Sequence, residues 1–244
     1  MTIALEIAVQ DPDGVVAAVR GGADRIELCT ALALGGLTPS AALIEAAVAA
    51  AQSVHVLVRP RPGGFEYSSA EATVILDDVR RALDAGARGV VVGAVRDGRV
   101  DTQLVARVRE TVGSAEVTFH RAFDTLADRD QAIDLLAELG VDRVLTSGGA
   151  SRATDALDDI ARLVARADGR VEVMAGAGID AATVGAVAAT GVAAIHASAK
   201  RTVDETHQID LGALARAGTS TREVTDELRV RALRTALDAL ERAR

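Results

Sequence analysis

The stretch FHRAFD, residues 119–124, places a histidine, an arginine and an aspartate within five positions. Histidine exchanges a proton near neutral pH, and an arginine or a carboxylate beside it can hold an anion or orient its ring. The stretch directly follows a short apolar run that is typical of a strand. We therefore expect His120 to point inward at a strand end, while Arg121 and Asp124 begin the loop and Asp124 braces an arginine. Catalysis, ligand binding and a purely structural use all fit this pattern.

A repeated pattern predicts the elements that position these groups. In each repeat a glycine ends a stretch of helical period, and a short β-branched run follows. Further strand candidates lie between the repeats, so eight strands alternate with helices at about 28 residues per unit, which suits parallel strands with helical crossovers. The repeats are GGADRIEL at 21–28, AGARGVVV at 85–92, LGVDRVLT at 139–146 and TGVAAIHA at 190–197.

Eight such units in 244 residues match the size of a closed (β/α)₈ TIM barrel, an α/β fold, and we predict a single domain over residues 1–244. An open doubly wound sheet is the alternative, but it usually has fewer strands, and no GxGxxG follows the first strand. We predict a polar loop at 201–222 and then the eighth helix, with Ser220 and Glu223 at capping-box spacing.

Strand alternation predicts which side chains face the barrel axis. Outward positions under the helices should be uniformly apolar, and polar groups should gather on the inward positions. Taking Leu5 and Ile7 as outward makes Glu6 inward, and the same parity extends to the other strands. Arg143 and Glu172 lie early in their strands, so we expect an ion pair at the bottom face. The inward polar groups that lie late in the strands, and should ring one mouth, are Glu27, Cys29, Arg59, Arg61, His120, Ser147 and His196.

Carboxylates, arginines and histidines at one mouth could form a proton-transfer site for a small anionic metabolite. In this hypothesis His120 is the acid or base, Glu27 is its partner, and Arg59 and Arg61 hold the anion. The alternative is a buried ion network without chemistry, in which Glu27 pairs with Arg59 and Glu6 pairs with Arg61.

Glycine-rich turns after the later strands suggest a phosphate site. Gly176, Gly178 and Ser198 follow the seventh and eighth strands, where many barrels bind phosphate with backbone amides. Ser147 and Gly148 follow the sixth strand and could add to the same cradle. Tight turns that simply need glycine are the alternative.

Soft metal donors are few in this chain. Cys29, Met174 and His120 could offer a thiolate, a thioether and an imidazole to Cu(I). However, Cys29 is the only cysteine, and no CxxC or HxH spacing occurs. A lone buried Cys or Met usually serves packing, so both interpretations stay open.

The composition excludes several classes of protein. A net charge of -8 and a pI near 5.1, with no basic run, argue against a nucleic acid partner. The longest uncharged run, residues 28–44, is interrupted by glycine and proline, so we expect no membrane span. A single cysteine and the absence of a secretory signal pattern favour a cytoplasmic protein.

Taken in order, the motifs RIELC, GGLTPS, RPRPGGFEYS, FHRAFD, LTSGGA, VMAGAGI and IHASA resemble the CutC family. The resemblance covers about residues 4–200 and implies a (β/α)₈ barrel, a cytoplasmic homo-oligomer, and a link to copper homeostasis with copper binding. It carries no defined reaction or substrate. The family positions that match are Glu27, Cys29, Arg59, Arg61, His120, Arg121, Asp124, Ser147 and His196. Two hypotheses result: a copper-handling protein, and a barrel enzyme acting on a small anionic, phosphorylated metabolite.

Overall fold

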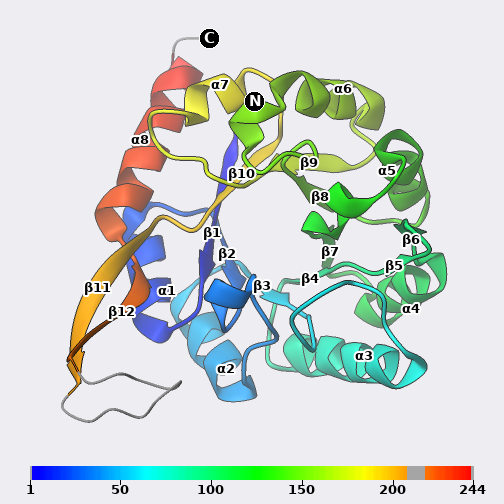
Figure 1. The fold of residues 1–244 in the computed structure, drawn as a ribbon, viewed down its shortest axis with the longest axis horizontal. Helices are drawn as coiled ribbons and strands as arrows, with labels where there is room; N and C mark the ends of the chain where they lie inside the picture. The colour runs from blue at the N-terminus through cyan, green and yellow to red at the C-terminus, as the bar shows by residue number, and fades with distance from the viewer. Residues whose placement is uncertain (1, 208–217, 243–244) are drawn as a thin grey trace.

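The computed structural model describes residues 2–207 and 218–242, which form a closed barrel of parallel strands (Figure 1). The strand order around the barrel is β1-β10-β9-β8-β7-β4-β3-β2, and β1 closes on β10 with Leu5 opposite Ile195. The predicted (β/α)₈ barrel is confirmed. Its strands are β1 Ala4–Val9, β2 Arg25–Leu28, β3 Val54–Leu57, β4 Gly89–Val92, β7 Glu116–Phe119, β8 Arg143–Thr146, β9 Glu172–Ala175 and β10 Ala194–Ala197.

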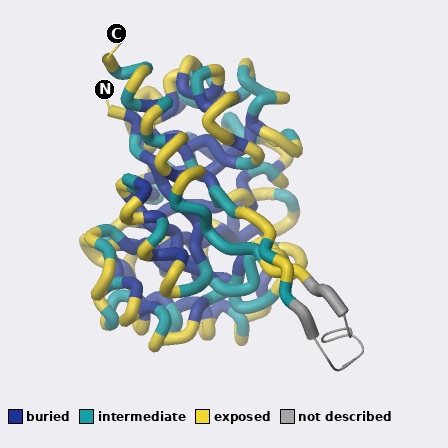
Figure 2. Tube along the Cα trace, turned by 90° about the vertical axis from the view of Figure 1, so that its left-hand side faces the viewer, coloured by how far each residue is buried: buried dark blue, intermediate teal, exposed yellow. Residues whose placement is uncertain are grey.

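Helices surround the strands, and Figure 2 shows the exposed positions at the periphery with the buried chain inside. Capping side chains mark several helix starts: Asp11 accepts from Gly14, and Ser68 forms a capping box with Glu71. Gly22 ends the first helix with a φ of 91°, as the repeat predicts. The helices are α1 Pro12–Gly21, α2 Ala41–Ala50, α3 Ser69–Asp84, α4 Thr102–Val112, α5 Arg129–Glu138, α6 Leu157–Ala167, α7 Val184–Ala188 and α8 Glu227–Arg242, and short elements are η1 Leu32–Leu34, β5 Val95–Arg96, β6 Arg99–Val100, η2 Arg121–Thr125 and η3 Ala153–Asp155.

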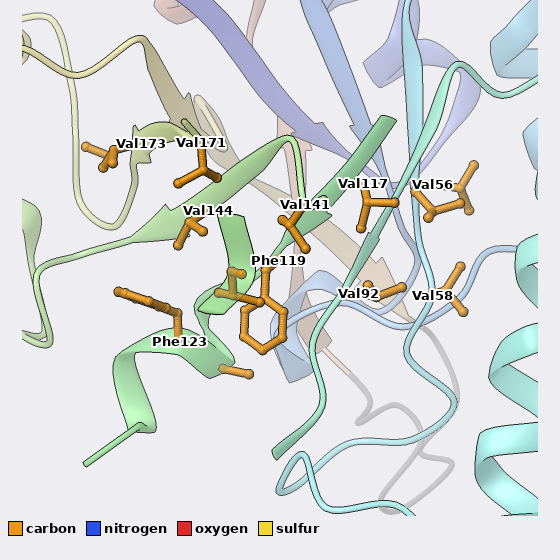
Figure 3. Close-up of a cluster of buried hydrophobic side chains, with 14 of the residues drawn as sticks. Val56, Val58, Val92, Val117, Phe119, Phe123, Val141, Val144, Val171 and Val173 are labelled. Carbon is orange, nitrogen blue, oxygen red and sulfur yellow. The ribbon is translucent and has the colours of Figure 1, made fainter. Parts of the chain in front are cut away.

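The core lies between the outer face of the barrel and the helices. Figure 3 shows Val56, Val117, Phe119 and Val144 packed in this layer, and all four are fully buried. The opposite parity carries the buried polar side chains, including Glu6 at 0% exposure. Since strand side chains alternate between faces, this division directs the polar groups into the barrel, as predicted.

The bottom of the barrel is closed by an ion network around Arg143. Its guanidinium pairs with Glu172 at 2.7 Å and with Glu116 at 3.0 Å, and it also donates to Thr118 Oγ1 at 3.1 Å. Arg143 is 4% exposed, so the carboxylates offset the cost of burying its charge. The predicted pair between Arg143 and Glu172 is confirmed and lies away from the mouth.

The described part of the predicted polar loop, residues 201–207 and 218–222, is not a loop. They belong largely to an antiparallel hairpin of β11 Lys200–His207 and β12 Gly218–Thr225, while residues 208–217 lie outside the described residues. Ser220 therefore sits within a strand and does not cap the last helix. Asp226 takes that position, since its Oδ1 accepts from the Leu228 amide at 2.9 Å. Threonine and valine in this stretch favour a strand despite their polar neighbours. Among the described residues, no helix has the length and apolar character needed to cross a membrane.

Candidate functional site

A cavity of about 410 Å³ opens at the carboxyl ends of the strands, where barrel enzymes bind their substrates. Apolar side chains such as Leu57, Phe65 and Leu145 form part of its wall. The structure brings most of the predicted mouth residues to this one cavity. The polar residues that line it are Glu27, Arg59, His120, Arg121, His196 and Ser198.

A chain of charged groups runs from the barrel interior to the cavity. Glu6 is fully buried, forms an ion pair with Arg25, and accepts a hydrogen bond from His196 Nδ1 at 2.8 Å. Burial opposes the ionisation of Glu6, but Arg25 and His196 outweigh it and hold the pKa of Glu6 well below its usual range. Glu6 therefore stays charged and fixes the orientation of the His196 ring.

Glu27 is the carboxyl group that this chain presents to the cavity. Its Oε2 lies 3.7 Å from His196 Nε2, which is longer than a hydrogen bond, so the carboxylate stays available to a ligand. Burial raises the pKa of Glu27 to about 7; His196 opposes this increase, and Glu6 adds to it. Burial would lower the pKa of His196, but Glu27 and Glu6 outweigh it and raise that pKa. Glu27 can therefore accept and release a proton near neutral pH.

His120 is held as a neutral hydrogen-bond donor. Its Nδ1 accepts the Ala122 amide hydrogen at 3.0 Å, so the ring proton is on Nε2, which has no partner in the described part of the chain. Burial first and the charge of Arg59 second lower the pKa of His120 to about 3. The centre of the His120 ring lies 4.9 Å from that of Phe65. Residue 93 is a glycine, and any side chain there would clash with the His120 ring. This geometry favours a fixed donor over the acid or base predicted for His120.

Arg59 faces the cavity without a carboxylate partner among the described residues. It donates to the carbonyl oxygens of Leu34 and Gly36, both at 3.0 Å, and of Gly63 at 2.8 Å. These bonds tie the loops after β2 and β3 together across the mouth. The predicted network pairing Glu27 with Arg59 is not formed, because backbone carbonyls take up the guanidinium instead.

Arg61 does not join the mouth. It pairs with Glu71 at the start of α3, and its side chain is 38% exposed. The alternative in which Glu6 pairs with Arg61 is therefore wrong, since Glu6 pairs with Arg25. Sequence reasoning overlooked Arg25, although strand parity places it inward with Glu27 on β2.

Asp124 organises the turn after β8. Its carboxylate accepts from Arg121 Nε at 2.8 Å, which confirms that it braces an arginine, and from Ser147 Oγ at 2.9 Å. It also accepts the amide hydrogens of Ser147 and Gly149, while the Gly148 amide donates to Thr146 Oγ1. The amides predicted to bind phosphate at Ser147 and Gly148 are therefore engaged within the protein.

The turns after β9 and β10 differ, because their amides are free. Within residues 2–207 and 218–242, the amides of Ala177, Gly178, Ile179 and Ser198 donate to no protein acceptor, and all four residues line the cavity. Gly176 is engaged, since its amide donates to the Thr146 carbonyl at 2.9 Å. Free amides after the seventh and eighth barrel strands are suited to phosphate.

The soft donors predicted for copper do not converge. Cys29 packs against Leu57 and Val91, whereas Met174 packs against Leu145 in a separate cluster, and neither lines the cavity. Burial, and then Glu27, raises the pKa of the Cys29 thiol, which disfavours the thiolate that binds metal. The sulfur of Met174 lies 3.4 Å from the Arg25 guanidinium.

Three harder donors do lie together. Ligand atoms of Glu6, Glu27 and His196 lie within 4.8 Å of one another, the one such group of three found in the described part of the chain. Carboxylates and imidazole suit a divalent ion better than Cu(I). However, Arg25 already balances the charge of Glu6, and His196 Nδ1 is engaged by it. Glu6 and His196 are therefore engaged within the protein, and Glu27 is the member of the group that accepts no hydrogen bond from the described residues.

Comparison with known proteins identifies the family of this chain and supports its fold. The CutC family model matches residues 3–201. A CutC family protein of Sinorhizobium medicae is 42% identical over 98% of this chain and 97% of its own length. A Streptococcus agalactiae protein provisionally assigned as the copper homeostasis protein CutC is 29% identical, with a TM-score of 0.77 over 81% of this chain and 99% of its own. Thiamine phosphate pyrophosphorylase from Pyrococcus furiosus is 15% identical, with a TM-score of 0.61 over 98% of this chain and 96% of its own, and shares the fold alone. The chain therefore belongs to the CutC family.

Proposed function

We propose that the chain is an enzyme that binds a small phosphorylated metabolite in the barrel mouth and moves a proton with Glu27. One observation carries this proposal: a carboxyl group whose pKa burial raises to about 7 faces the same cavity as free backbone amides. A group with a pKa near neutral is suited to general acid–base catalysis. In a buried ion network that binds no ligand, Glu27 and the amides of the β9 and β10 turns would each have a close partner within the protein.

The phosphate end of the ligand is assigned to the turns at Ala177–Ile179 and Ser198. Gly178 has a φ of 68°, and its neighbour Arg152 donates to the Gly178 carbonyl at 3.3 Å, which adds positive charge nearby. Thermal unfolding with sugar phosphates tests this assignment. A ligand at 100 times its dissociation constant should stabilise the protein by about 2.7 kcal/mol. The corresponding sugars without phosphate should stabilise it much less.

A matched pair of substitutions locates the phosphate. Gly178→Asn and Gly178→Asp have similar shapes, and both residue types tolerate a positive φ better than other side chains. We expect Gly178→Asp to bind a stabilising sugar phosphate at least about tenfold more weakly than Gly178→Asn, because its carboxylate repels the phosphate. Isothermal titration of both variants gives this ratio. Equal affinities would place the phosphate elsewhere.

Copper handling in the cytoplasm is the second candidate, and the resemblance to the CutC family supports it together with homo-oligomer formation. The donors present do not fit a Cu(I) site, because Cys29 and Met174 lie in separate apolar clusters. We expect wild type and Cys29→Ser to bind Cu(I) equally weakly, within about twofold, in a competitive titration with a Cu(I) chelator. A large loss of affinity in Cys29→Ser would instead restore copper as the ligand.

A further inference from the structure

Two buried groups at the mouth face the cavity from different strands, and each lacks a close partner in the described residues. Glu27 lies in the second strand of the barrel, and His120 directly follows the fifth. We infer that the substrate carries a carbonyl group that accepts a hydrogen bond from His120 Nε2, and that Glu27 removes the proton from the carbon beside this carbonyl. The inference rests on the proposed function and names its substrate class, a phosphorylated aldehyde or ketone.

His120 determines where the carbonyl oxygen lies. Its Nε2 carries a hydrogen that meets no protein acceptor in the described residues, although the side chain is only 6% exposed. A buried donor of this kind is normally satisfied, so an acceptor from a ligand is expected there. Arg59 Nε is a second buried donor that meets no acceptor in the part of the chain that the structure describes, and Arg59 lines the same cavity. Two donors on one cavity suit an oxygen that gains negative charge during the reaction.

Because His120 is neutral, its site favours a substrate carbonyl, which accepts a hydrogen bond, over a substrate group that must receive a proton. The Ala122 amide holds the tautomer, and apolar contact with Phe65 disfavours a second ring proton. The ring can therefore polarise an oxygen without giving up its own proton. A carboxylate base with a neutral histidine donor is the arrangement that another barrel enzyme, triosephosphate isomerase, uses for enolisation. A substrate carboxylate fits less well here, since it would add negative charge beside Glu27 and Glu6.

Glu27 is placed to act as the base. Its carboxylate accepts no hydrogen bond from the described residues, and His196 faces it at 3.7 Å with its ring fixed by Glu6. In the step, the C–H bond breaks, its proton goes to Glu27, and its electron pair moves into the carbonyl to give an enolate. His120 and Arg59 stabilise the enolate oxygen. Glu27 then returns the proton to the same carbon, which restores the carbonyl compound, so no oxidant or further reactant is needed.

Hydrogen exchange tests this inference. Dihydroxyacetone phosphate, ribulose 5-phosphate and fructose 6-phosphate that stabilise the protein are incubated with it in D₂O, and proton NMR follows the carbon beside the carbonyl. We expect deuterium to replace hydrogen there in wild type but not in Glu27→Gln, and EDTA should not change the rate. Glycerol 3-phosphate, which has no carbonyl, is the control ligand.

Two substitutions at residue 120 separate the donor from the fold. His120→Asn keeps an acceptor for the Ala122 amide but loses the donor at Nε2, whereas His120→Gln can place an amide N–H near that atom. We expect His120→Asn to slow exchange by about 10²-fold or more, and His120→Gln to regain part of the rate. Carbonyl phosphates that bind without exchange, or exchange that persists in Glu27→Gln, would overturn this inference while phosphate binding stands. If no phosphate binds, the proposed function fails as well.

Discussion

Replacing Glu27 with glutamine is expected to slow turnover of a carbonyl phosphate by about 10²–10⁴-fold, the usual contribution of a general acid or base. Glutamine has nearly the same shape but cannot take a proton from carbon, so the dissociation constant of the ligand should change only slightly. The turnover number and the dissociation constant are measured separately, by the exchange assay and by titration. If Glu27→Gln binds the ligand more weakly but keeps the wild-type turnover number, Glu27 only holds the ligand.

A matched control identifies the cause of such a loss. Glu45 is an exposed carboxylate on α2 that does not line the cavity, and Glu45→Gln should turn over at the wild-type rate. His196→Asn tests the position of the Glu27 carboxylate, because it removes the ring that Glu6 holds toward Glu27. We expect this variant to shift the pH profile of turnover as well as its rate.

The same Glu27→Gln substitution is expected to stabilise the protein at neutral and higher pH. Burial raises the pKa of Glu27 from 4.5 to about 7, so the folded protein favours the protonated form. The stability that this preference contributes is complete below pH 4.5 and is lost as the pH rises through about 7. A shift of this size corresponds to about 3 kcal/mol. Glutamine does not ionise, so Glu27→Gln does not lose this stability as the pH rises. Above about pH 7 its free energy of unfolding should exceed that of wild type by the same amount.

Urea unfolding of both proteins between pH 4.5 and 8 measures this difference. The charged or titratable groups that face Glu27 are Glu6, Arg25, His196 and Cys29. Glu6 keeps its charge over this range, because Arg25 and His196 hold its pKa well below the usual value after outweighing burial. Parallel curves for wild type and Glu27→Gln would mean that the Glu27 carboxylate is not destabilised by burial. An enzyme site commonly carries such a cost in stability.

The barrel could be predicted because each strand–helix unit carries its own local signal. A glycine at the helix end precedes each repeated strand, and Gly22 indeed adopts a positive φ. Alternation along the strands then placed Glu6 and Glu27 inward, which agrees with the contact of Glu6 with His196 and with the position of Glu27 on the cavity wall. These signals depend on neighbouring residues, so they can be recognised without knowledge of distant contacts.

The parts that could not be predicted depend on contacts between distant residues or on positions beyond the strands. β3 ends at Leu57, so parity no longer determines the direction of Arg61, which turns to Glu71. The amides at Ser147 and Gly149 are taken up by Asp124, and no sequence signal showed that this carboxylate would reach them. The protonation of His120 likewise depends on the Ala122 amide and on the burial of its ring.

The hairpin of β11 and β12 was missed for a different reason. Its strands alternate charged residues with threonine and valine, and no apolar face distinguishes them from a loop. Strand propensity depends strongly on cross-strand partners, and the pairing of Val203 with Arg222 becomes visible only in the structure.

The central claim is that the Glu27 carboxyl group is held at the mouth with a pKa suited to proton transfer. Carbon-13 NMR of protein labelled at the glutamate side-chain carboxyl carbons measures it directly, and the resonance missing in Glu27→Gln identifies Glu27. We expect its titration midpoint at about pH 7. A midpoint near the ordinary value of 4.5 would contradict the proton-transfer site described here.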